Sequence, residues 1–202
     1  MKITAAMAMS LALAVSAQAV GKVRACMNSG AFVSFSDLAR AETIALRMFA
    51  TAGVTLEWRS AGSAACRNSD ETRTVVLDFH IHTAPGEHPG AFAYALPYQG
   101  SHIVVLFDRF ERSAGGPRQV STVLAHVMAH EIAHLLEGVA RHSQSGVMKA
   151  RWDAHDFMQM AVTPLPFDPE DIDLIQCGLR LSAVGAMAAV PPANAATTVE
   201  LH

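Results

Sequence analysis

Two histidines four residues apart, His130 and His134, with Glu131 directly after the first, form the segment of the chain best suited to chemistry. On an α-helix, residues i and i+4 are separated by about 40° of rotation and about 6 Å of rise, so both imidazoles can reach one metal ion. Glu131 would then lie beside the metal. Its carboxylate could take a proton from a zinc-bound water, whose pKa the metal lowers to about 7, and pass it to a leaving amine. This spacing therefore predicts metal-assisted hydrolysis of peptide bonds.

A catalytic zinc ion takes three protein ligands and keeps one position open for water, so a third ligand must lie outside this segment. His142 is the leading candidate, because Gly138 can end the helix and let the chain turn back. His126, one turn before His130, is expected to pack against the protein, since a third ring in the same row cannot complete a tetrahedron. The alternatives for the third ligand are one histidine and three carboxylates nearer the C-terminus: His155, Glu170, Asp171 and Asp173.

Hydrophobic periodicity predicts the elements that must position these residues. Strand patterns cover residues 23–27, 54–58, 74–82, 91–96 and 102–107, and helical patterns cover residues 35–52, 117–137 and 168–181. Because Gly138 is of the type usually found just past a helix end, the histidine segment is expected on the last two turns of the second helix.

The length and charge of the chain limit the classes of function. Residues 20–182 suffice for one core and are too few for two independent domains, so we expect a single catalytic domain there. The net charge is only −3 and no basic run is present, which disfavours nucleic acid or an anionic membrane surface as a partner. A substrate is therefore expected to bind in a cleft.

The two ends of the sequence differ from the middle in composition. Residues 1–19 have the pattern of an export signal, with Lys2, an uncharged apolar run and the small-x-small segment Ala17-Gln18-Ala19. The apolar run is shorter than the roughly 20 residues that cross a bilayer. We expect cleavage after Ala19, a secreted or periplasmic location, and no stable membrane association afterwards. Residues 183–202 are alanine-rich and are expected to form a disordered tail.

Three cysteines, Cys26, Cys66 and Cys177, allow one disulfide and one remaining thiol in an exported chain. The sequence does not determine the pairing, and we favour Cys26 with Cys66. The alternative is that all three are small buried apolar side chains.

The segment after His142 carries a family resemblance. It contains Ser143, the turn Gly146-Val147-Met148 and Trp152. Together with the HExxH segment, it resembles the metzincin metallopeptidases, whose motif joins HExxH to a glycine turn, a third histidine and a methionine-containing turn. In that family the glycine follows the second histidine by three residues and the third histidine follows the glycine by three. Here Gly138 follows His134 by four residues and His142 follows Gly138 by four, so His142 is eight residues after His134 and a loop can absorb the two extra residues.

The resemblance implies a set of roles and a fold. His130, His134 and His142 would bind Zn²⁺, Glu131 would be the general base, and Met148 would be the turn methionine. The fold would be α+β and zincin-like, with a mixed twisted sheet of about four to five strands, an N-terminal helix, an active-site helix and a C-terminal helix. An antiparallel edge strand near residues 90–94 would bind an extended peptide or protein substrate by strand addition.

We therefore predict an exported zinc-dependent peptidase of metzincin-like type, with Glu131 as its catalytic residue. Two other classes stay open. One is a catalytically inactive zinc-binding interaction module, and the other is a soluble domain that carries HExxH by chance.

Overall fold

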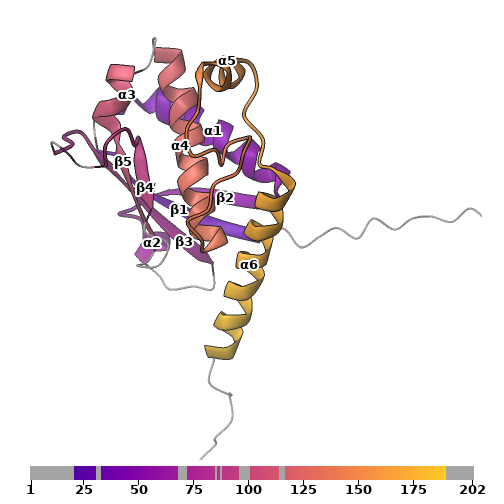
Figure 1. Cartoon of the computed structure of the whole chain (residues 1–202). Coiled ribbons are helices and arrows are strands. Elements are labelled where there is room, and N and C mark those ends of the chain that lie inside the picture. Colours follow the sequence, from indigo (N-terminus) through magenta and orange to yellow (C-terminus); the bar gives the residue numbers. More distant parts are fainter. Residues whose placement is uncertain are drawn as a thin grey trace, which may run out of the picture.

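The computed structural model describes residues 21–30, 33–67, 72–84, 86, 88–95, 101–113 and 117–189 (Figure 1). The elements in chain order are β1 (Gly21–Asn28), α1 (Phe35–Thr51), β2 (Val54–Ser60), α2 (Ala64–Arg67), β3 (Arg73–His80), β4 (Ala93–Ala95), β5 (His102–Leu106), α3 (Phe107–Ser113), α4 (Pro117–Glu137), α5 (Ala154–Val162) and α6 (Pro169–Ala189).

The strands form one five-stranded mixed sheet in the order β2-β1-β3-β5-β4. Neighbouring strands are parallel except β4, which pairs antiparallel with β5 through Ala93 opposite Val105 and Ala95 opposite Ile103. Strand β4 therefore lies at an edge of the sheet. The predicted α+β class, with a mixed sheet and an antiparallel edge strand, is confirmed.

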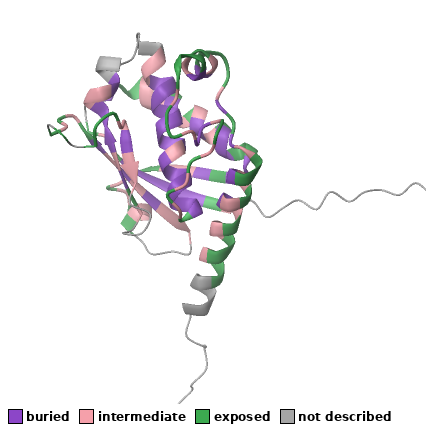
Figure 2. Cartoon of the chain, viewed as in Figure 1, coloured by how far each residue is buried: buried purple, intermediate pink, exposed green. Residues whose placement is uncertain are grey.

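Helices α1 and α4 provide the apolar layer on one face of the sheet. Alternate residues of β1, β3 and β5 belong to the same core cluster as the buried residues of both helices. Helix α4 is buried along most of its length, whereas residues 180–184 of α6 are mostly exposed (Figure 2). A helix that is apolar all round must be surrounded by protein. Helix α4 is thus the central helix, fixed by neighbours on several sides.

The other face of β1 carries the disulfide. Cys26 alternates with the core residues of the strand and is bonded to Cys66 of α2, as predicted. Arg24, on the same face of the strand, donates a hydrogen bond to the carbonyl of Ala65, 3.1 Å away. Cys177 on α6 is a free, exposed thiol.

Several element boundaries differ from the predictions. Helices α2, α3 and α5 were not predicted, and β3 ends at His80, two residues early. Helix α6 continues to Ala189, so the predicted tail at 183–202 is wrong for its first seven residues. Alanine-rich sequence is a strong helix former, which explains this continuation. The predicted export signal and the rest of the tail lie outside the described residues. Among the residues that are described, no helix is long and apolar enough to cross a bilayer.

Candidate metal centre

Helix α4 places His130, Glu131 and His134 on its last two turns, as predicted. The helix ends at Gly138, whose φ is +69° and whose N–H donates to the carbonyl of His134 at 3.0 Å. This left-handed conformation strains residues with a Cβ atom and is favourable for glycine. The chain then turns back and brings His142 close to His130 and His134.

The three predicted histidines lie together. One ring nitrogen from each falls in a group whose members are all within 4.8 Å of one another. The Nε2 atoms of His130 and His134 are 3.0 Å apart. The ring of His142 lies 5.3 Å from that of His130 and 5.0 Å from that of His134, measured between centroids. The two extra residues between the second and third histidines are thus accommodated in the loop.

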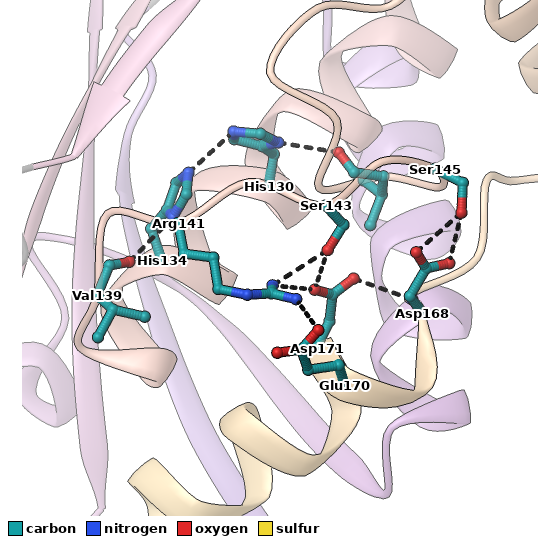
Figure 3. Close-up of polar contacts among 10 residues, drawn as sticks. His130, His134, Val139, Arg141, Ser143, Ser145, Asp168, Glu170 and Asp171 are labelled. Atoms are coloured by element: carbon teal, nitrogen blue, oxygen red, sulfur yellow. Dashed lines mark hydrogen bonds and ion pairs between the residues drawn. The ribbon is translucent and has the colours of Figure 1, made fainter.

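Backbone carbonyls orient the two helical histidines (Figure 3). Nδ1 of His130 lies 2.9 Å from the carbonyl oxygen of Val147, and Nδ1 of His134 lies 3.3 Å from that of Val139. A carbonyl only accepts, so each Nδ1 carries the proton and each Nε2 presents its lone pair. Two lone pairs 3.0 Å apart repel unless a cation lies between them. Tetrahedral zinc, with bonds of about 2.0–2.1 Å, needs such nitrogens about 3.3 Å apart. The donor set therefore fits zinc.

The surroundings keep these imidazoles neutral, the form that binds a metal. Burial, followed by the charge of His134, lowers the pKa of His130 to about 3. Burial and then the charge of His142 lower the pKa of His134 to about 4, against a small opposing effect of the Val139 carbonyl. Burial also lowers the pKa of His142. At neutral pH the three imidazoles can therefore bind a cation without first losing a proton.

Glu131 lies between the histidines and the edge strand. Its side chain is buried, and burial raises the pKa of Glu131 to about 7. The backbone N–H of Ala95, in β4, donates to the carboxylate and partly opposes that shift. A carboxyl group that titrates near neutral pH can both accept and return a proton, as a general acid–base group must.

The methionine-containing turn contacts His130 through its backbone. Met148 is fully buried, and its carbonyl accepts from the N–H of Ser143 at 2.8 Å. The N–H of Val147 donates to the carbonyl of Pro166 at 2.8 Å, which attaches the turn to the segment before α6. The turn then presents the Val147 carbonyl to His130. Its backbone therefore acts on the orientation of one candidate ligand.

The alternative third ligands lie elsewhere or are occupied. Asp171 is fully buried and bonds to Arg141 and Ser143, while the carboxylate of Glu170 pairs with Arg141 at 2.5 Å (Figure 3). Asp173 is exposed on α6, and His155 is exposed on α5. The structure brings His142, and none of these four, to the two helical histidines.

Comparison with solved structures identifies the fold. Archaemetzincin from Methanopyrus kandleri aligns with a TM-score of 0.51 at 17% sequence identity, over 82% of this chain and 99% of that chain. The chain therefore shares its overall fold with this solved structure. A zinc-dependent peptidase from Methanocorpusculum labreanum aligns with a TM-score of 0.49 at 11% identity, over 76% of this chain and 99% of that chain. Comparisons of the sequence with protein-family models and with curated proteins find no match.

Within this fold, a cleft of about 670 Å³ opens beside the histidines. One wall is the segment 89–93 leading into β4, and the other is the segment 149–152 after the methionine turn. His130, Glu131 and His142 lie on its floor. Two of the three candidate ligands, His130 and His142, and the candidate base Glu131 thus line the same space beside an edge strand.

Sequence reasoning missed part of this cleft. Phe92 and Phe157 line it, and Trp152, which was noted only as part of the resemblance, lies with its ring edge-on to His130 at 5.9 Å between centroids. The sequence feature that could have indicated the helix carrying Phe157 is the capping box at the start of α5. In it, Asp153 and Asp156 each accept a hydrogen bond from the other's backbone N–H.

His126 packs as predicted and does not join the cluster of three histidines. It is fully buried, with Nδ1 2.7 Å from the carbonyl of Thr122 and Nε2 accepting from the N–H of Leu165 at 2.9 Å. Both ring nitrogens are therefore satisfied. Its role is to join α4 to the segment before α6.

Proposed function

We propose that this protein is an exported, metzincin-like zinc peptidase that hydrolyses peptide bonds. The observation that carries the proposal is the facing pair of Nε2 atoms at 3.0 Å, with His142 beside them and Glu131 next to the pair. Three neutral imidazoles around an open cleft are the ligand set of catalytic zinc, which keeps a fourth position free. His130, His134 and His142 would hold the ion.

Zinc, when bound at such a site, supplies Lewis acidity that polarises a carbonyl and makes water acidic near neutral pH. The role of Glu131 follows from its environment. Burial makes its carboxylate a stronger base than an exposed one, so it can take the proton of the attacking water. Because its pKa is about 7, it can then return the proton to the departing amine. The N–H of Ala95 fixes the carboxylate while this happens.

Strand β4 supports the choice of a peptide or protein as substrate. It is an edge strand, it is antiparallel to β5, and the segment before it forms a wall of the cleft. An extended chain that pairs with this edge would place a backbone carbonyl over the histidines. Nucleic acid and membrane partners are not part of the proposal.

The location is also a proposal. The signal-like residues 1–19 and the disulfide between Cys26 and Cys66 both favour an oxidising compartment, either the extracellular space or the periplasm. The sequence and the disulfide support export independently of each other.

The test compares the parent with Glu131→Gln, both loaded with zinc, on a mixture of peptides analysed by mass spectrometry. Glutamine has the shape of glutamate and cannot accept the proton, so we expect unchanged zinc content and a loss of kcat/KM of about 10²–10⁴-fold. Arg180→Gln, which alters an exposed residue of α6, is the control and should retain activity. Equal cleavage by Glu131→Gln and the parent would refute the proposed role of Glu131. A zinc-loaded parent that cleaves no peptide would support an interaction module instead.

A further inference from the structure

Of the three clustered histidines, His142 differs in how its ring is held. The Nδ1 atoms of His130 and His134 lie within hydrogen-bond distance of backbone carbonyls, at 2.9 and 3.3 Å. For His142, the described structure shows ring contacts with the other two histidines and no hydrogen bond. It is also exposed. Its position must therefore come from the loop backbone on either side of it.

Both neighbours of His142 in the chain bind the same buried carboxylate. Arg141 donates from Nη1 to Oδ1 of Asp171 at 2.8 Å, and Ser143 donates from Oγ to the same oxygen at 2.5 Å (Figure 3). Arg141 also pairs through Nη2 with Glu170 at 2.5 Å. The two residues that flank the candidate ligand are thus attached to the first turn of α6.

Asp171 is well suited to hold this loop. It is fully buried, and its second oxygen accepts from the N–H of Asp168 at 2.9 Å, which fixes the carboxylate to the start of α6. Separating Arg141 and Ser143 from Asp171 would leave a buried carboxylate without two of its hydrogen-bond donors, which is unfavourable. The contacts with Asp171 therefore favour one position of the loop, and His142 is held in place with it.

We propose that Asp171 is a positioning residue that sets the affinity of the three-histidine site for zinc by holding Arg141 and Ser143. This rests on the proposed function only in assuming that the histidines bind zinc. A loop that is already ordered loses less entropy when it binds, so breaking the attachment weakens binding although all three ligands remain. Partners that orient metal ligands typically change metal affinity by about 10–100-fold.

The experiment measures the Kd for zinc by competition with a chromogenic chelator. Ser143→Ala removes the hydroxyl hydrogen bond to Asp171 and leaves the ion pair with Arg141. Arg141→Lys keeps the positive charge and loses the guanidinium that bonds to both Asp171 and Glu170. Asp171→Asn removes the negative charge of the carboxylate. Ser145→Ala is the matched control, because Ser145 contacts Asp168 at 2.8 Å from the same loop without flanking His142. We expect weaker binding by about 10–100-fold for the first three variants and a Kd near the parent value for the control.

A double-mutant cycle separates positioning from general stability. In the His142→Ala background, where the two remaining histidines bind zinc too weakly to retain it on dialysis, Ser143→Ala should no longer alter the residual Kd, since the ligand through which it acts is gone. An equal effect of Ser143→Ala with and without His142 would overturn the proposal, and so would parent-like Kd values for Ser143→Ala and Arg141→Lys. These two milder variants decide the matter even if Asp171→Asn fails to fold. A parent that binds no zinc would instead refute the proposed function.

Discussion

Glu137, at the C-terminal end of α4, is a second carboxyl group with an unusual environment. It is buried, and neither of its oxygens has a hydrogen-bond partner among the described residues. Burial and then the charge of Asp171 raise the pKa of Glu137 to about 7, and Arg141 partly opposes this. Because it sits three residues after His134, it adds a pH-sensitive group to the end of the active-site helix.

The sign of its effect on stability follows from linkage. The pKa in the folded protein, about 7, is above the ordinary value of 4.5, so the folded protein keeps a proton that the unfolded chain has released. The stabilising contribution is complete below the unfolded pKa and is lost as pH rises through the folded one. Glu137→Gln cannot ionise. Between about pH 5 and about pH 8, the parent should lose roughly 1–2 kcal/mol of stability relative to Glu137→Gln, after allowance for screening by Arg141. Urea unfolding at both pH values measures this, and a pH-independent difference would contradict the assignment.

The positions of the individual site residues on helix α4 were the most predictable part of the site. The spacing of His130, Glu131 and His134 follows directly from the repeat of a helix, and the structure places all three as expected. Asp171 was considered as a ligand and instead holds the loop that carries His142. Nothing in the sequence indicates that contact, because 30 residues separate it from Arg141.

At the scale of elements, predictions succeeded where the sequence marks both ends. Helix α4 begins at Pro117 and ends before Gly138, and both boundaries were predicted. Helix α3 was missed because it starts at Phe107, directly after β5, with no turn residue between. Helix α5 was missed because its nine residues are too few for periodicity to be distinct.

Helices α4 and α6 approach closely at a position that sequence alone does not reveal. A Cβ atom added to Gly178 would lie 1.8 Å from the carbonyl oxygen of Leu136, a backbone atom near the end of α4. Only glycine permits this distance, since real Cβ contacts of that length do not occur. The contact supports the part of α4 that carries His134.

Gly178→Ala should therefore destabilise the protein, although alanine is the better helix former by about 1 kcal/mol. The forced separation of the two helices is expected to outweigh this gain and give a net loss of about 1–3 kcal/mol, measured by thermal or urea unfolding. Cys177→Ala, at the exposed neighbouring position, is the control and should change stability little. A Gly178→Ala protein as stable as the parent would show that the helices do not pack this closely.

At the scale of the whole molecule, the disulfide and the metal centre occupy separate regions. Cys26 lies on the face of β1 opposite the core residues that pack under α1 and α4. The bridge closes a loop of 40 residues and restricts the unfolded chain more than it shapes the site.

Replacing both Cys26 and Cys66 by serine should thus lower the free energy of unfolding by about 2–4 kcal/mol. At a temperature where the variant stays folded, its Kd for zinc should equal that of the parent. Chelator competition checks the second part, and a large change in zinc affinity would show that the two faces of the sheet are coupled.

The most direct test of the account is the zinc content of the purified protein after dialysis, measured by elemental analysis for the parent and for His142→Ala. Three histidines that converge on one point predict one zinc ion per parent chain and none retained by the variant. A parent without zinc would contradict the metal centre. Zinc retained in full by His142→Ala would contradict the assignment of the third ligand.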